Sequence, residues 1–433
     1  MKKHLTGPYL YAALSFLFLY AGWSSWFSFF QIWLTDPVGG LGLNGKQVGT
    51  IFSFNGLAVM FTLLTYGAVQ DRIGLRRNLL FFISIMATLI GPFGVLIYRP
   101  LLEGNFYIGV LLGAIFFAVS YSAPASFSEA YFNRFARHHK FEFGRARMFG
   151  SFGFACGVIA MGALYPLNPD IIFWAASVMG VMLLLTQIFG TKAPQEASKE
   201  VLQEISAEVP QEALVDTAVS VESAEQVKTS LWQDFQEVVR NRKLWVLSAW
   251  VVLVWTMFSI FDSQMFPNFF ASLFATPETG QRAYSALVFT YVIIETILMS
   301  LVPILVRKIG AKKAMLLGSA LILTMIAGAG IFDLIPLIVA ARLLHGLTVP
   351  LMVLGALHYV NLHFDPARSA SVYLISFYIA AQVAIMVIAT PLGMLRDAYG
   401  YQAAFLVMAL ASVTGIILAA LLLERDADAI NEL

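Results

Sequence analysis

The sequence predicts an all-α integral membrane protein with about twelve transmembrane helices in two pseudo-symmetric six-helix bundles. Composition, the recurrence of long apolar stretches and one polar interruption lead to this prediction. Of the 433 residues, 59% are hydrophobic and 12% are charged, whereas soluble domains carry about 25% charged residues. A water-soluble core could not bury this much apolar surface.

Apolar stretches of about the roughly 20 residues that a helix needs to cross a bilayer recur along the chain. The first is too long for a signal-peptide core and lacks a small-residue cleavage site, so we expect it to be a retained helix. The predicted spans are 8–34, 46–68, 78–98, 105–132, 146–165, 171–190, 244–272, 284–306, 314–332, 334–360, 369–394 and 402–423.

One long polar segment divides these spans six and six. It is acidic, rich in Glu, Ala and Ser, and has no aromatic residue before Trp232. Such a composition is typical of a flexible or partly helical linker, to which we assign no chemistry. The predicted organisation is therefore an N-terminal bundle at 1–190, a cytoplasmic linker at 191–240 and a C-terminal bundle at 241–433.

The positions of Lys and Arg predict the orientation, because positively charged loops stay on the cytoplasmic side. Of the 27 basic residues, Arg147 and Arg342 lie inside predicted spans. If both termini are cytoplasmic, the outer loops contain only Lys46, Arg99, Arg282 and Arg396. This asymmetry predicts a multi-pass protein with both termini in the cytoplasm.

Several classes of function find no support in the sequence. The single cysteine, Cys156, rules out an internal disulfide and makes a thiolate metal site improbable. A net charge of +1 gives no electrostatic reason to expect nucleic acid. We find no metal-ligand cluster, no nucleophile with a base and no phosphate-binding glycine loop. We therefore expect no cofactor, no metal and no enzymatic activity.

The two halves share a short basic motif after their second span. The segment GAVQDRIGLRRN runs from Gly67 to Asn78, and VRKIGAKKA runs from Val306 to Ala314. Repeated halves indicate a transporter with its substrate site between them, near the middle of the bilayer. The alternative is that short cytoplasmic loops attract Gly and Arg in any membrane protein.

The first of these loops resembles the loop signature of the major facilitator superfamily. The resemblance implies a conformational gate, in which Asp71 caps a helix or pairs with a neighbouring Arg as the cytoplasmic side closes. The residues that carry it are Gly67, Asp71, Arg72, Gly74, Arg76 and Arg77.

A second motif places a carboxylate and a guanidinium in two spans joined by a short basic loop. These residues are Glu129 and Arg147. An ionisable residue in a span costs about 2.5–3.5 kcal/mol on insertion scales, so it usually faces a cavity or a partner. A planar guanidinium with a nearby carboxylate suits the hydroxyls of a sugar. From charge alone, a salt bridge that joins the two helices is an equally good interpretation.

The segment EFGRARMFG at Glu142 to Gly150 closely resembles the oligosaccharide:proton symporter family, and FFQIWLTD and FPNFFASLFAT extend the match. The resemblance implies that Glu129 and Arg147 bind sugar and that Phe154 replaces a tryptophan that stacks on the ring. It implies a small sugar and a proton as ligands, and a monomer in the lipid bilayer of a bacterial inner membrane.

The C-terminal half departs from the family pattern. Arg342, His345 and Thr348 lie on one side of the tenth helix, where the family has a basic residue, a histidine and a proton-binding glutamate. The arginine that serves this glutamate aligns with Met325. A second family ion pair aligns with Ser259 and Ala381, so both partners are missing in each case. Asp262 and Arg342 match the remaining pair.

Glu295 is the candidate that replaces the missing carboxylate. It could accept a sugar hydroxyl, carry the proton, or do both, because a low-dielectric site raises the proton affinity of a carboxylate; a helix-packing hydrogen bond is the alternative. We expect His345 to donate to a sugar oxygen. Trp26 and Phe30 share a face of the first helix that, by resemblance, lines the cavity and could stack on a sugar.

These observations predict a permease that imports a disaccharide or small oligosaccharide by alternating access with proton symport. Glu295, His345, Asp262 and Arg342 are the candidates for proton coupling. The alternatives are a sugar uniporter or exchanger, and a related permease for a nucleoside or an aromatic acid. A membrane enzyme or a sugar sensor lacks supporting motifs.

Overall fold

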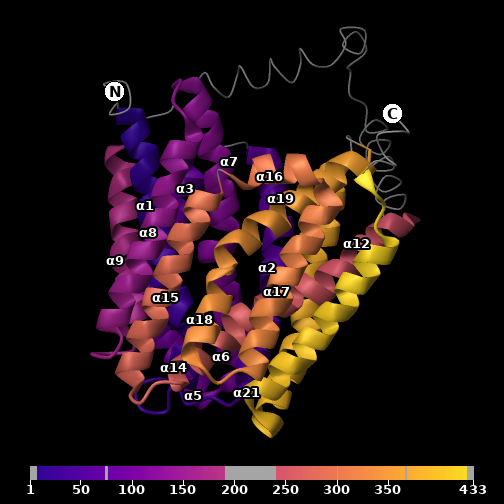
Figure 1. Ribbon diagram of the computed structural model, residues 1–433. Helices are drawn as coiled ribbons and strands as arrows, with labels where there is room; N and C mark the ends of the chain where they lie inside the picture. The colour runs from indigo at the N-terminus through magenta and orange to yellow at the C-terminus, as the bar shows by residue number, and fades with distance from the viewer. Residues whose placement is uncertain (1–6, 74–76, 191–239, 300, 366–367, 427–433) are drawn as a thin grey trace.

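The computed structural model describes residues 7–73, 77–190, 240–299, 301–365 and 368–426, and these residues form helices joined by short turns (Figure 1). The elements before the linker are α1 (Gly7–Thr35), α2 (Gly45–Ile73), α3 (Arg77–Thr88), α4 (Ile90–Pro92), η2 (Phe93–Tyr98), α5 (Arg99–Gly104), α6 (Phe106–Phe117), η3 (Ala118–Ser122), α7 (Ala123–His138), α8 (Phe143–Leu164) and α9 (Ile171–Phe189).

The elements after the linker repeat this all-helical pattern. They are α12 (Arg242–Trp250), η5 (Val251–Trp255), α13 (Thr256–Ile260), η6 (Phe261–Met265), α14 (Phe266–Ser272), α15 (Pro277–Leu298), α16 (Val302–Ile309), α17 (Ala311–Ile331), α18 (Ile335–Leu343), α19 (His345–His363), α20 (Ser369–Tyr373), η7 (Leu374–Ile379) and α21 (Ala380–Leu422). The η elements are π-helical turns inside longer helices.

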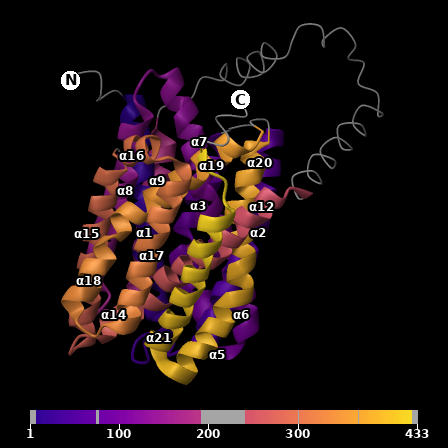
Figure 2. The ribbon, with the colours of Figure 1, turned by 45° about the vertical axis from the view of Figure 1, so that its right-hand side comes forward.

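Among the described residues, eight helical runs are long and apolar enough to cross a membrane, and α15 with α16 forms a ninth that bends by 60°. One run covers 52 residues, enough for two spans, and its backbone leaves the helical conformation at Gly400, where φ is +84°. The helix α2 and the continuous run from α6 to α7 lie alongside these spans (Figures 1 and 2). This arrangement agrees with twelve membrane-crossing helices.

The helices define two faces of the molecule. We call the end at which α1 begins and α21 finishes the terminal face, and the end at which α1 finishes and α2 begins the opposite face. Both views show the terminal face at the top, with a bend of α21 at the bottom (Figures 1 and 2). The described chain therefore begins and ends on the same side, as an even number of crossings requires.

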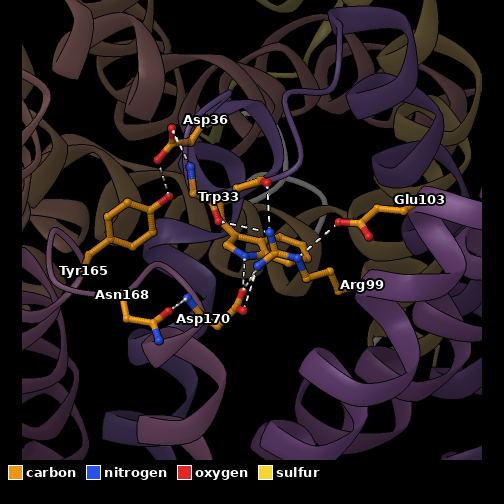
Figure 3. Close-up of polar contacts among 9 residues, drawn as sticks. Trp33, Asp36, Arg99, Glu103, Tyr165, Asn168 and Asp170 are labelled. Carbon is orange, nitrogen blue, oxygen red and sulfur yellow. Dashed lines mark hydrogen bonds and ion pairs between the residues drawn. The ribbon is translucent and has the colours of Figure 1, made fainter.

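A polar cluster fastens the first half together at the opposite face (Figure 3). The guanidinium of Arg99 donates to both carboxylate oxygens of Asp170, at 2.8 and 2.7 Å, and the indole N–H of Trp33 donates to the same carboxylate at 2.9 Å. Arg99 also donates to the backbone carbonyls of Gly39 and Gly40. These bonds join the end of α1 to α5 and α9, and they satisfy polar groups that the apolar spans cannot.

The two halves are also joined near the opposite face. The carboxylate of Asp397 in α21 accepts the backbone N–H of Gly45 at 2.6 Å and that of Lys46 at 2.8 Å. These are the first amides of α2, where the helix dipole and unpaired N–H groups favour an anion. Further inside, the hydroxyls of Ser53 and Thr390 lie 3.0 Å apart. One half therefore caps a helix of the other.

Small residues allow the backbones of the two halves to approach closely here. A Cβ atom at Gly49 would clash with the backbone oxygen of Ala389, and one at Gly162 would clash with the hydroxyl of Ser285. The contacts between α2 and α21, and between α8 and α15, therefore depend on glycine at these points. Close backbone approach through small residues is the usual basis of helix packing in membranes.

Of the predicted gate motif, Gly67, Asp71 and Arg72 lie in the last turns of α2, and Arg77 begins α3. Gly74 and Arg76 lie outside the described residues, and the side chains of Gly67, Asp71, Arg72 and Arg77 are also outside the part that the structure describes. Its conformational role therefore stays a prediction.

We predict that Asp397→Ala favours opening at the opposite face, because it removes an anion that two amides of the other half bind. In a Cys156→Ser background, a cysteine at Ser285 should react with an impermeant maleimide about tenfold faster after this change, the effect of losing roughly 1.4 kcal/mol.

The matched control for this prediction is Asp333→Ala, because Asp333 accepts from Gln402 within a single half. It should leave the labelling rate of the cysteine unchanged. Equal labelling rates in the Asp397→Ala and parent proteins would contradict a role of Asp397 in closing this face.

Candidate functional site

Glu129, Arg147 and Tyr20 form a polar cluster in the first half. The Nε atom of Arg147 in α8 donates to Oε1 of Glu129 in α7 at 2.7 Å. The hydroxyl of Tyr20 in α1 donates to the same Oε1 at 2.9 Å and accepts from Nη2 of Arg147 at 2.9 Å. Three helices therefore hold one carboxylate and one guanidinium in a fixed relation.

Aromatic rings support this guanidinium from behind. The Cζ atom of Arg147 lies 4.2 Å from the ring centroid of Tyr20 and 5.6 Å from that of Phe16. Cation–π contacts of this kind are attractive and fix the plane of the guanidinium. The side chains of Glu129 and Arg147 remain 43% and 28% exposed although they lie inside membrane spans. Both groups therefore keep free hydrogen-bonding capacity toward an accessible space.

A second chain of ionisable groups lies in the second half. Arg342 in α18 is paired with Asp262 in η6. His345, at the start of α19, has Nε2 3.7 Å from Asp262 Oδ1 and Nδ1 3.7 Å from Glu295 Oε2. A single imidazole therefore lies between two carboxylates that come from different helices.

The two ends of this chain differ in their surroundings. The side chain of Arg342 is 2% exposed, and its Cζ atom lies 4.5 Å from the ring centroid of Phe266 and 5.1 Å from that of Tyr291. The side chains of Asp262 and Glu295 are 27% and 23% exposed. The arginine is therefore a buried structural cation, whereas both carboxylates can be reached from the accessible space.

Glu295 links the two clusters across the molecule. It interacts electrostatically with Arg147 of the first half. The hydrogen bonds that join the halves lie toward the opposite face, so we infer that the exposed charged groups are reached from the terminal face. The sequence-predicted pair Glu129–Arg147 is thus related to the pair Glu295–His345 through the interaction of Arg147 with Glu295.

Four neutral residues stand at positions where the family has charged residues, and each is either hydrogen-bonded or an apolar residue that is buried. The hydroxyl of Thr348 donates to the carbonyl of Leu344 at 2.9 Å, and that of Ser259 donates to Trp255 at 2.9 Å. Met325 and Ala381 are buried, at 1% and 4% exposed. No unpaired charge replaces either missing pair at these four positions, as the cost of a lone buried ion requires.

The structure differs from the expectation for Trp26 and Phe30. They are 5% and 2% exposed, and Trp26 stacks on Phe117 of α6 with ring centroids 4.5 Å apart. They are packing residues between α1 and α6 in this conformation, because the face that they share turns toward a neighbouring helix. Phe154 is half-buried and lies on the same helix as Arg147.

Tyr20 and Tyr291 are the members of the site that the sequence analysis missed. Tyr20 bonds both members of the first cluster, and the ring centroid of Tyr291 lies 4.2 Å from that of His345. A tyrosine inside an apolar span carries a hydroxyl that needs a partner, and this signal was present in both spans. The sequence alone could not identify the partner.

A metal centre is not part of this arrangement. Among the described ranges, no group of three or more His, Cys, Asp and Glu side chains could hold a metal ion. The clustered charges instead offer paired donors and acceptors to a neutral polar solute, together with a carboxylate chain that can exchange a proton.

The described chain is an all-helical membrane bundle with charged residues on facing helices of its two halves. Solved transporters share this fold. The nucleoside transporter NupG matches with a TM-score of 0.76 at 14% identity over 97% of this chain and 100% of that chain. A D-xylose-proton symporter matches with a TM-score of 0.62 at 14% identity, covering 98% of each chain.

The particular family follows from the sequence match. The family model of the LacY proton/sugar symporter matches residues 1–432, and the chain belongs to this family. The predicted family, the multi-pass helical fold and the class of transporter are therefore confirmed, and the family is one of permeases, not of enzymes.

Named relatives agree with this assignment. The sucrose permease of Escherichia coli is 34% identical over 91% of this chain and 88% of its own length. The melibiose permease of Enterobacter cloacae subsp. cloacae is 30% identical over 94% of this chain and 90% of its own length. The raffinose permease of Escherichia coli is 30% identical over 92% of this chain and 89% of its own length.

We predict that Asp262→Ser destabilises the protein, because it leaves the buried guanidinium of Arg342 without its carboxylate. The free energy of unfolding should fall by about 3–5 kcal/mol. The double variant Asp262→Ser with Arg342→Met should recover most of this loss, since the chain already has uncharged residues at two other family charge pairs. Thermal unfolding in detergent tests both changes, and a single variant as stable as the parent would contradict the prediction.

Proposed function

We propose that this protein imports a disaccharide or small oligosaccharide by alternating access, coupled to proton symport. The observation that carries the proposal is the part-exposed Glu129–Arg147–Tyr20 cluster, whose arginine interacts electrostatically with Glu295 of the second half. Its donors and acceptors are part-exposed and supported by aromatic rings, as binding of a neutral polyol requires. The named relatives transport sucrose, melibiose and raffinose, which supports an oligosaccharide as substrate.

We further propose that Glu295 is the site of proton uptake. It is a part-exposed carboxylate inside a span, close to the sugar-binding arginine and 3.7 Å from His345. His345 could pass a proton between Glu295 and Asp262, because an imidazole has one nitrogen toward each carboxylate. Protonation would remove the negative charge of Glu295 and alter its attraction to Arg147, which links the proton to closure around the sugar.

The remaining predictions fit this proposal. The basic loops support placement in a bacterial cytoplasmic membrane with both termini inside, so the terminal face would be cytoplasmic and the opposite face external. Residues 1–190 and 241–433 would then move as two bundles joined by the linker at 191–240. The protein would act as a monomer, with the motif at Gly67 to Arg77 as the cytoplasmic gate.

Uptake of labelled sucrose, melibiose and raffinose, with unlabelled nucleosides and aromatic acids as competitors, tests the substrate. We expect Arg147→Lys to lower saturable uptake at least about tenfold, because an ammonium loses the planar, stacked donor geometry. Its matched control is Arg145→Lys, because Arg145 lies on the same helix as Arg147 and forms an exposed ion pair with Glu142. Transport of a nucleoside or an acid in place of all three sugars would contradict the proposal.

Glu295→Gln tests the coupling. The amide keeps hydrogen-bonding capacity but cannot release a proton, so sugar exchange down its gradient should continue while sugar-driven alkalinisation of a lightly buffered suspension disappears. Thr296→Val is the control, because the hydroxyl of Thr296 donates to the carbonyl of Val292 within its own helix. Alkalinisation that persists in Glu295→Gln would place proton coupling at another residue.

A further inference from the structure

A continuous row of aromatic rings lies in the second half, between α12 and the start of α21. Tyr373 has its ring centroid 5.6 Å from Tyr378 and 5.2 Å from Phe377, to which it is nearly parallel. Phe377 lies 5.2 Å from Trp255, and Trp255 lies 5.5 Å from Phe258. None of these rings belongs to the charged clusters already described.

The two ends of this row meet the two ends of the proposed sugar site. At one end, the ring of Phe258 lies 5.5 Å from that of His345. At the other end, Tyr378 interacts electrostatically with Glu129, which belongs to the first half. The row therefore runs along the second half from His345 to a position near Glu129.

The rings of this row differ in exposure, and this separates rings that a substrate could contact from rings that hold them in place. Tyr378 is 43% exposed, and Trp255 and Tyr373 are half-buried. Phe258 and Phe377 are 3% and 2% exposed and hold the other rings in place. Because Tyr378 lies near enough to Glu129 of the first half to interact with it electrostatically, we place its exposed ring on the side of the second half that is turned toward the first.

The backbone at these rings is also unusual. Trp255 ends the π-helical turn η5, and Tyr378 lies in the π-helical turn η7. Single π turns inside α-helices occur frequently at functional sites, since the extra residue redirects the side chains. The third such turn in this half, η6, carries Asp262 of the coupling chain.

The residues beside the aromatic row are uncharged. Ser259 follows Trp255 by four residues and Ala381 follows Tyr378 by three, so each lies near a ring of the row on its own helix, and both are neutral where the family has an ion pair. The surface formed by the aromatic row and these two residues therefore offers aromatic faces and small side chains. A sugar ring presents apolar C–H faces and polar edges, and an aromatic ring binds such an apolar face.

We propose that Trp255, Tyr373 and Tyr378 form a stacking subsite for a second sugar ring, beyond the one held by Glu129 and Arg147. This inference rests on the proposed function and assigns the second ring of the proposed disaccharide or oligosaccharide to named residues of the second half. A monosaccharide would occupy only the Glu129–Arg147 cluster and would not reach these three rings.

Transport kinetics of Tyr378→Ala, Tyr378→Phe and Trp255→Leu test the subsite, with labelled sucrose, melibiose and raffinose as substrates and glucose and galactose as competitors. We expect Tyr378→Ala and Trp255→Leu to raise the KM of the transported disaccharide or trisaccharide about threefold to tenfold. Tyr378→Phe keeps the ring and should change it less than twofold. Inhibition by the monosaccharides should be unchanged in all three variants.

Tyr399→Ala is the matched control, because Tyr399 is 75% exposed at the turn near Gly400; it should have the kinetics of the parent. An unchanged KM in both Tyr378→Ala and Trp255→Leu, or an equal loss for monosaccharides and larger sugars, would overturn the subsite. Absence of sugar uptake by the parent protein would instead overturn the proposed function. Tyr378→Phe separates loss of the ring from misfolding, since it retains the packing.

Discussion

The requirement that a charge inside the membrane has a partner governs the rest of this structure. Arg342 is almost fully buried, yet Asp262 and three aromatic rings surround it. Where the chain lacks one partner of a family ion pair, it lacks the other partner as well. Among the described residues, the part-exposed charges Glu129, Arg147, Asp262 and Glu295 all belong to the two polar clusters.

The same requirement explains how the site can respond to a ligand. The carboxylate of Glu129 binds two donors, Arg147 and Tyr20, and a sugar hydroxyl could replace either bond without leaving a charge unpaired. In the second half, His345 lies between the carboxylates of Asp262 and Glu295, which belong to different helices. Loss or gain of one proton on the imidazole therefore changes its electrostatic attraction to both helices at once. Closure at the opposite face depends on different chemistry, because Asp397 binds backbone amides and glycines allow close approach.

Much of this arrangement was predictable because it depends on local chemistry. Apolar length predicts spans, and Glu129 with Arg147 was identifiable because each is costly in a span. Trp26 and Phe30 show where this reasoning fails. Their spacing correctly indicated a shared helix face, but which neighbour covers that face depends on how α6 packs against α1. Tyr20 was missed for the same reason, since its partners are more than a hundred residues away in the sequence.

The sequence by itself determined the membrane class, the family and the residues that must pair, because hydrophobicity and charge cost are properties of single residues and short segments. Only the tertiary structure decided that His345 lies between Asp262 and Glu295, that Tyr20 joins the Glu129 pair, and that Asp397 caps α2 of the other half. These contacts join residues far apart along the chain. Their geometry follows from helix packing, which a pattern of residue types does not specify.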